Sequence, residues 1–238
     1  MLRALIFDVD GTLADTESTH RAAFNQAFVE SGLDWHWDEA LYGELLSISG
    51  GRERIRHYWQ KFYPATFTDS SEIDEQIARL HRLKTVAYTR VADAGGIHLR
   101  PGVLALIREA QREGLPMAIA TTTTPDNIAA LLGHALGHDW RSLFAAVGDA
   151  ATAPLKKPHP QVYQQVLTEL KLDPQQCIAF EDSGNGLTAA TAAGIPTLIT
   201  PTPYTADHDF SSALQVLPDL GHINLAQVRC WHAALNQN

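Results

Sequence analysis

The sequence predicts an α/β protein, a doubly wound parallel sheet interrupted by an inserted helical domain. Short apolar runs that end abruptly in polar residues recur along the chain, as strands buried on both faces do. Helix-like stretches, with apolar residues three and four apart, lie between most of these runs. A third observation is that residues 14–92 have helical spacing almost throughout and no comparable strand run. We therefore assign residues 1–13 and 93–238 to the sheet domain and residues 14–92 to the helical insertion.

The predicted strands follow one another in the order expected for alternating strands and helices. They are Ala4–Phe7, Met117–Ala120, Leu143–Val147, Ile178–Phe180, Thr197–Ile199 and Leu214–Leu217. Helical spacing is clearest between Val103 and Ala110 and between Val162 and Leu170, and the tail after Pro218 is interpreted as a final packing helix. In such a sheet, ligands gather at the carboxyl ends of the strands.

The insertion is expected to be helical and to follow the first strand directly. Most of its aromatic residues cluster between Trp35 and Phe67, and we interpret Trp35, His36 and Trp37 as packing residues. Gly95-Gly96 breaks the last helix and returns the chain to the sheet domain.

Composition excludes several classes of function. Of the 238 residues, 18 are Lys or Arg and 27 are Asp or Glu, which gives a net charge of −9. Because an acidic surface repels phosphate backbones, we expect no nucleic-acid partner. No apolar run approaches the roughly 20 residues of a membrane span, so we expect no membrane partner. Cys177 and Cys230 offer no disulfide framework, and no signal peptide precedes the first strand, so we expect a cytoplasmic protein.

The strongest motif is Asp8-Val9-Asp10-Gly11-Thr12, directly after the first predicted strand. Two carboxylates at i and i+2 can project into one site once the strand period breaks, and Gly11 permits a sharp turn. One carboxylate can attack an electrophile while the other handles protons. The alternative is an Asx turn at the end of a strand.

Glu181-Asp182-Ser183 follows another predicted strand, so its carboxylates can meet Asp8 across the sheet edge. Carboxylates packed together repel, so a cation is expected among them, and hard oxygen ligands favour Mg²⁺. The alternative for Asp182 and Ser183 is capping of the following helix.

Two further motifs suit a phosphate. Lys157, in Lys156-Lys157-Pro158, offers a point charge for phosphate oxygens, whereas a solvated surface pair is the alternative. Hydroxyl and backbone N–H groups of Thr121–Thr124, ahead of a helix, can form an anion cradle, although Thr123 and Thr124 are as well explained by helix capping.

Other nucleotide and hydrolase motifs are weak or absent. Gly184-Asn185-Gly186 begins a match to the dinucleotide fingerprint, but three polar residues separate it from the strand. The sequence contains no phosphate-binding P-loop and no G-x-S-x-G nucleophile motif. A dinucleotide oxidoreductase is therefore a distant alternative.

The ordered set of these motifs resembles the haloacid dehalogenase (HAD) superfamily, in its phosphatase and phosphomutase branch. The helical insertion sits where that family carries its C1 cap, so the resemblance covers the whole chain. Within the branch, Ala40–Ser49 followed by Gly50-Gly51, the Lys156-Lys157-Pro158 motif and Ala179–Ser183 look closest to CbbY-type proteins. CbbY-type enzymes of photosynthetic organisms remove phosphate from xylulose-1,5-bisphosphate, an inhibitor of Rubisco in the Calvin cycle.

The resemblance implies roles for the core residues. Asp8 would attack phosphorus and form an aspartyl-phosphate, and Asp10 would protonate the leaving alkoxide and then activate water. Mg²⁺ would bind the Asp8 carboxylate, the Asp10 backbone carbonyl and Asp182, with Glu181 supporting the metal or its waters. The phosphoryl oxygens would be held by Thr121, the Thr122 N–H and Lys157.

The resemblance also implies that the cap chooses a phosphorylated sugar. The expected substrate-binding residues are Glu17, His20, Arg52, Lys84, Thr122, Ser183 and Asn185, with Arg52 and Lys84 as the cations for a far phosphate. We expect a monomer. A β-phosphoglucomutase-like mutase shares these motifs, and a non-catalytic phosphate-binding regulator is the alternative outside enzymes.

Overall fold

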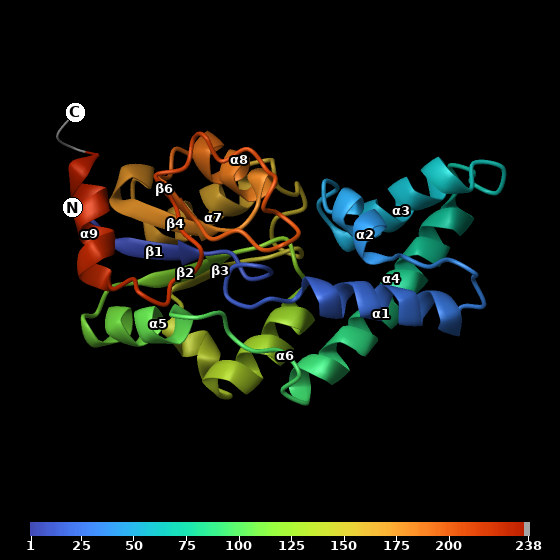
Figure 1. Ribbon diagram of the computed structural model, residues 1–238, viewed down its shortest axis with the longest axis horizontal. Coiled ribbons are helices and arrows are strands. Elements are labelled where there is room, and N and C mark those ends of the chain that lie inside the picture. Colours follow the sequence, from blue (N-terminus) through green and yellow to red (C-terminus); the bar gives the residue numbers. More distant parts are fainter. Residues whose placement is uncertain (236–238) are drawn as a thin grey trace.

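A computed structural model describes residues 1–235 of the chain as a parallel sheet with helices on both faces and a helical lobe at one end (Figure 1). The sheet has six strands in the order β3-β2-β1-β4-β5-β6, and every neighbouring pair is parallel. The strands are β1 (Ala4–Phe7), β2 (Met117–Ala120), β3 (Ala146–Gly148), β4 (Cys177–Glu181), β5 (Thr197–Ile199) and β6 (Gln215–Val216). The predicted α/β fold class is confirmed.

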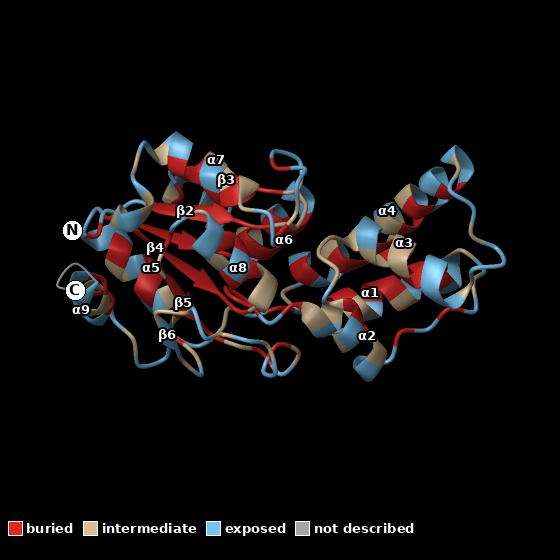
Figure 2. Cartoon of the chain, turned by 90° about the horizontal axis from the view of Figure 1, so that it is seen from above, coloured by how far each residue is buried: buried red, intermediate tan, exposed pale blue. Residues whose placement is uncertain are grey.

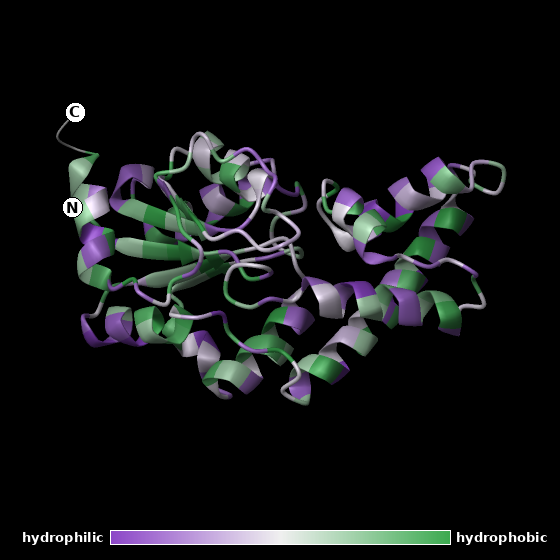
Figure 3. Ribbon diagram, in the orientation of Figure 1, coloured by the Kyte–Doolittle hydropathy of each residue, from purple (hydrophilic) through white to green (hydrophobic). Residues whose placement is uncertain are grey.

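Alternate residues of β1 face the two sides of the sheet. Leu5 and Phe7 pack in one apolar cluster with α5 (Val103–Arg112), α6 (Pro125–Leu136) and α9 (Leu225–Ala234). Ala4 and Ile6 pack in a second cluster with α7 (Gln161–Leu170) and α8 (Gly184–Ala192). Hydrophobic colour runs along the strands, and their buried colour continues to the sheet edge that faces the lobe (Figures 2 and 3). This double coverage explains the continuous apolar runs in the sequence.

Four predicted elements shift, one of them the sixth strand, which spans only Gln215–Val216 instead of Leu214–Leu217. Residues Trp140–Leu143 form a 3₁₀ turn, so the third strand begins at Ala146 instead of Leu143. The fourth strand extends through Glu181, which the sequence placed beyond the strand end. The segment after Pro218 stays irregular until Leu225, where Asn224 caps α9.

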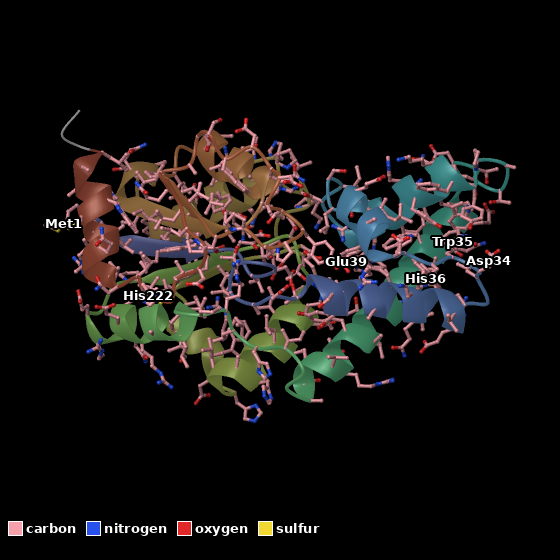
Figure 4. The ribbon with its side chains drawn as sticks, viewed as in Figure 1. Met1, Asp34, Trp35, His36, Glu39 and His222 are labelled. Atoms are coloured by element: carbon pink, nitrogen blue, oxygen red, sulfur yellow. The ribbon has the colours of Figure 1, made fainter. Side chains whose placement is uncertain are left out.

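The helical lobe, here called the cap, contains α1 (Glu17–Glu30), α2 (Glu39–Leu45), α3 (Gly51–Phe62) and α4 (Ser71–Asp93). Its apolar cluster is separate from the two clusters of the sheet and is rich in aromatic rings. Trp35 and Trp37 are buried in it, as predicted for packing residues, whereas His36 is exposed and does not pack. Trp35 and His36 lie in the outer part of the cap, away from the sheet (Figure 4). The exact domain boundaries stay a prediction.

The two chain segments that join the cap to the sheet lie side by side. Ala14 forms an isolated bridge with Leu99, and the Arg100 N–H donates to the Leu13 carbonyl at 2.8 Å. The Arg100 guanidinium also donates to the carbonyls of Gly11 and Thr200. Arg100 therefore fixes the turn after β1 against the loop after β5.

Among the described residues, no helix has both the length and the apolar character needed to cross a membrane.

Candidate active site

Three carboxylates meet at the carboxyl edge of the two central strands. Asp8 follows β1, Glu181 ends β4, and Asp182 comes next. One oxygen from each lies within 4.8 Å of the others, and all three residues are buried. Because β1 and β4 pair in register, with Phe7 opposite Phe180, the fold brings together residues more than 170 positions apart in sequence.

A single lysine enters this cluster. The Lys157 ammonium donates to Asp8 Oδ1 at 2.6 Å, to Glu181 Oε1 at 2.5 Å and to the Ala120 carbonyl at 2.8 Å. The Tyr163 hydroxyl donates to the same Glu181 oxygen at 2.5 Å. Burial disfavours the charged lysine, but the carboxylates of Asp8 and Glu181 outweigh it and raise the pKa of Lys157.

Negative charge in the cluster exceeds positive charge. Burial raises the pKa of Asp8 to about 7, and burial together with the neighbouring carboxylates raises the pKa of Asp182 well above its usual value. The buried Oε2 of Glu181 has no hydrogen-bond partner in the described chain. Three carboxylates with one ammonium, and one orphaned oxygen, fit a hard divalent cation bound by oxygen ligands.

The turn after β1 leaves room for this arrangement. Gly11 adopts a φ of +78°, and a Cβ added there would lie 2.6 Å from the Asp182 carboxyl carbon. Only glycine therefore lets the Asp8–Thr12 turn approach Asp182 so closely.

Asp10 belongs to a different network, directed toward the cap. Its Oδ1 accepts from the Thr16 hydroxyl at 2.7 Å and from His20 Nε2 at 2.9 Å. Burial favours a protonated Asp10, but His20 and both hydrogen bonds hold its pKa below the usual range. The second nitrogen, His20 Nδ1, lies 2.6 Å from the Lys84 ammonium. Because an ammonium only donates, Nδ1 accepts and Nε2 carries the proton given to Asp10.

This contact changes the expected role of Lys84. The residue is buried, and burial lowers its pKa to about 8. It lines the larger of the two spaces between sheet edge and cap, and its bond to His20 adds a positioning role to the phosphate contact predicted for it, which stays a prediction.

The threonine run divides into two halves. Thr124 caps α6, and the Thr123 hydroxyl accepts from Asn127 Nδ2 at 2.9 Å. Thr121 follows β2 and, together with Thr122, lines the chamber that contains Asp8. The first two threonines therefore line the chamber that contains Asp8, whereas Thr123 and Thr124 line the neighbouring larger cavity.

Two adjoining spaces lie between the sheet edge and the cap. A chamber of about 80 Å³ surrounds the carboxylate cluster, and an open cavity of about 470 Å³ lies beside it. Both are lined by Asp10, Glu17, Gly50, Arg54 and Thr122. Each site residue predicted from the sequence lines at least one of these spaces, although their roles stay predictions.

The cap side is organised by a residue that the sequence analysis missed. Arg54 donates to the Tyr42 hydroxyl at 3.1 Å and to the carbonyls of Leu45 and Ile48 at 3.0 and 3.1 Å. The Tyr42 hydroxyl in turn donates to Glu17 Oε2 at 2.7 Å. Arg54 thereby holds the loop between α2 and α3. In the sequence, only its place two residues after Arg52 indicates a role.

Two charged residues reach the larger cavity from opposite sides. Arg52 is exposed on α3 of the cap, and Lys156 is half-buried on the sheet side, where its ammonium donates to the Ala150 carbonyl at 3.2 Å. Asn127 also lines the cavity, and its buried Oδ1 has no partner in the described chain. Arg52 was predicted from the sequence to bind substrate, whereas no role was predicted for Lys156 or Asn127.

Ser183 and Asn185 are both engaged within the protein. The Ser183 hydroxyl accepts from the Gly186 N–H at 3.1 Å, which makes Ser183 the cap of α8. Asn185 Nδ2 donates across to the Ser47 carbonyl and to Ser49 Oγ, each at 3.1 Å.

Comparisons with known proteins identify relatives of the chain. A model of the haloacid dehalogenase-like hydrolase family matches residues 2–194. The chain is 52% identical over 247 residues to the plasmid-encoded protein CbbY of Cupriavidus necator, covering 97% of each chain. It superposes with a TM-score of 0.89 on the crystal structure of CbbY from Rhodobacter sphaeroides in complex with phosphate, at 40% identity, covering 96% of this chain and 100% of that one. A mutant of the same protein, crystallised with xylulose-(1,5)bisphosphate, gives 0.88 at 39% identity, covering 95% and 99%.

Proposed function

The chain belongs to the haloacid dehalogenase-like hydrolases, as a CbbY-type phosphatase of sugar phosphates, and from that membership we propose its reaction. It removes one phosphate from a sugar bisphosphate, xylulose-1,5-bisphosphate or a close relative, through an aspartyl-phosphate on Asp8 and with Mg²⁺. Support for this substrate comes from the crystallised relative that holds that bisphosphate.

The observation that carries the proposal is the buried cluster of Asp8, Glu181 and Asp182 with a single lysine. Asp8, Asp182 and the supporting Glu181 would hold the metal, which supplies positive charge to the phosphoryl oxygens when it is bound. Phosphoryl transfer depends mainly on positioning and charge stabilisation, which this cluster is built to provide.

Asp8 is the nucleophile in this mechanism. Lys157 holds its Oδ1, while no group of the described chain hydrogen-bonds its Oδ2. An Asp8 oxygen attacks phosphorus as the bond from phosphorus to the sugar oxygen breaks. Thr121, the Thr122 N–H and Lys157 hold the phosphoryl oxygens during this step.

Asp10 moves the protons. It is ionised in the free chain, and a phosphate dianion bound beside it raises its pKa, so substrate binding favours the protonated acid. Asp10 then gives that proton to the leaving sugar oxygen. In the second step it takes a proton from a water that attacks phosphorus, which breaks the bond to Asp8 and releases phosphate.

The far phosphate needs its own cations, since each phosphate carries roughly −1.5 to −2 at pH 7. Arg52 and Lys156 line the larger cavity from the cap and the sheet domain, and Asn127 adds an unpartnered polar group. We assign the far phosphate to this cavity, with Lys156 in the place that the sequence analysis gave to Lys84.

The direct test is phosphate release from a panel of sugar monophosphates and bisphosphates, pentulose bisphosphates included, with Mg²⁺ and with EDTA. We expect the highest kcat/KM on a sugar bisphosphate and no release in EDTA. A mutase would instead produce an isomeric sugar phosphate without free phosphate. Turnover that survives EDTA would contradict the metal-dependent mechanism.

A further inference from the structure

The contact between Asn185 and the cap loop joins parts of the chain more than 130 residues apart. Asn185 is the second residue of α8, and Ser47–Ser49 lie between α2 and α3. Its side chain makes two hydrogen bonds of 3.1 Å across the space between sheet domain and cap. Asp10 of the sheet domain also accepts side-chain hydrogen bonds from Thr16 and His20 of the insertion.

The chemistry of the partners fixes the orientation of the amide. A backbone carbonyl only accepts hydrogen bonds, so the atom facing Ser47 must be the Asn185 nitrogen. An aspartate at position 185 would keep the shape of the side chain, but its carboxylate oxygen, which only accepts hydrogen bonds, would face the Ser47 carbonyl oxygen.

Both ends of the contact are held rigidly. On the sheet side, Ser183 caps α8 directly after Asp182, so Asn185 is fixed relative to the carboxylate cluster. On the cap side, Arg54 holds the loop through the carbonyls of Leu45 and Ile48. The loop is therefore pinned between Arg54 within the cap and Asn185 from the sheet domain.

The pinned loop forms a wall of the site. Ser49 and Gly50 line the chamber around the carboxylates, and Gly51 and Arg52 continue into the larger cavity. A second contact supports the same loop region, because Tyr204 of the sheet domain packs edge-on against Tyr42 at 5.8 Å between ring centres.

We propose that Asn185 is a positioning residue that latches the Ser47–Ser49 loop and so sets the closed position of the cap over the reacting groups. It acts through the loop and not by contacting substrate. The latch is remade each time a sugar phosphate is enclosed, so its hydrogen bonds stabilise the closed complex in which phosphoryl transfer takes place. The kinetic consequence rests on the proposed function, whereas the latch itself does not.

A double-mutant cycle tests how Asn185 acts. Each neutral hydrogen bond is worth a factor of about 2 to 12, so Asn185→Ala should lower kcat/KM for the sugar bisphosphate at least about 5-fold, chiefly through KM. Ser49→Ala should cost about 2-fold alone and nothing further in the Asn185→Ala background. Effects that multiply in the double variant would overturn the proposal, because they would mean that Asn185 acts separately from the loop.

A matched control and a substrate-free measurement complete the test. Thr188→Ala changes an exposed residue of the same helix and should leave kcat/KM unchanged. The position of the cap can also be measured without any substrate, as the distance between two spin labels. One label is attached at Gln60→Cys in the cap and the other at Gln175→Cys in the sheet domain, both in a Cys230→Ser background. Asn185→Ala should shift the distance distribution toward longer distances, and Thr188→Ala should not. An unchanged distribution in Asn185→Ala would refute the latch even if the assigned substrate were correct, and a shifted one would support it even if that substrate were wrong.

Discussion

Lys84 and Arg52 are both cations that line the larger cavity, but they differ in burial and therefore in the partners that they can bind. Lys84 is buried and bonded to His20, whereas Arg52 is exposed at the mouth of the larger cavity. A buried cation with an internal partner supports the partner, while an exposed cation beside a cavity is free to meet a ligand. The two residues should therefore respond differently to substitution.

Arg52→Ala should lower kcat/KM for a sugar bisphosphate roughly 10- to 150-fold, the value of a charge-assisted hydrogen bond. Hydrolysis of p-nitrophenyl phosphate should change much less, because this small monophosphate occupies only the chamber around Asp8. Steady-state kinetics on both substrates provide the measurement. Equal losses on the two would contradict a far-phosphate role for Arg52.

Lys84→Ala should instead lower kcat on both substrates by a similar factor, at least about 10-fold. The substitution leaves His20 Nδ1 without its donor and so disturbs the hydrogen bond from His20 to Asp10. The same two-substrate kinetics test this prediction. A loss confined to the bisphosphate would return Lys84 to the role that the sequence analysis gave it.

Metal binding should depend on pH because the ligands must lose protons. Burial raises the pKa of Asp8 to about 7, so protons on this carboxylate compete with the metal below that pH. Mg²⁺ affinity should therefore fall by up to about 10-fold per pH unit for each proton displaced, between pH 7 and pH 6. Calorimetric titrations at pH 6 and pH 8 measure this, and equal affinities would be inconsistent with the raised pKa.

The turn between β1 and the cap is the element on which the whole site depends. It carries Asp8 and Asp10, and Gly11 within it takes a positive φ against the Asp182 carboxyl group. An exact turn conformation is needed here because the turn and β4 converge on the cluster of Asp8, Glu181 and Asp182.

Gly11→Ala should therefore reduce turnover by more than 100-fold while the sheet still folds. The added methyl group strains the left-handed backbone by about 1–2 kcal/mol and displaces Asp182 from its place beside the turn. Circular dichroism and a Mg²⁺ titration should show native secondary structure with weakened metal binding. Wild-type metal affinity would show that this close approach is dispensable.

The helices and strands that could be predicted are those marked by residues close together in the sequence. Continuous apolar strands and the motifs that follow them located β1, β2, β4 and their acidic or hydroxyl residues. The start of β3 was wrong because Trp140–Leu143 turn as a 3₁₀ helix within an apolar-looking segment.

Contacts across the fold could not be predicted in this way. The bond from Arg100 to Thr200 and that from Asn185 to Ser49 join residues 100 or more positions apart, and no periodicity relates their positions. Lys156 is a further case: the sequence pointed to Lys157 as the lysine of the site, but nothing in it indicated that Lys156 would line the neighbouring cavity.

Across the whole molecule, the acidic cluster links metal binding to stability. Burying Asp8, Glu181 and Asp182 with one lysine costs free energy in the metal-free chain, because burial and mutual repulsion penalise the ionised carboxylates, and this penalty raises the pKa of Asp8 and of Asp182. A cation that binds only the folded chain offsets this cost, because binding raises the free energy of unfolding as the cation concentration increases.

Mg²⁺ at 100 times its dissociation constant should stabilise the fold by about 2.7 kcal/mol, seen as a rise in Tm that EDTA reverses. Asp182→Asn should remove most of this rise and should make the metal-free chain more stable than wild type, since a buried carboxylate with a raised pKa is gone. Thermal unfolding of both proteins, with Mg²⁺ and with EDTA, gives the comparison. An undiminished Mg²⁺ effect in Asp182→Asn would place the metal elsewhere.

The central claim is that Asp8 accepts the phosphoryl group, and inactivation alone does not prove it. Asp8→Asn should keep the fold and lose essentially all turnover, yet loss of a metal ligand would have the same effect. A crystal structure with Mg²⁺ and beryllium trifluoride, a stable mimic of an aspartyl-phosphate, tests the claim most directly. The account predicts beryllium bonded to an Asp8 carboxylate oxygen, with the fluorines contacted by Lys157 and the Thr121–Thr122 segment. Beryllium bonded to Asp10, or to no carboxylate of this site, would contradict it.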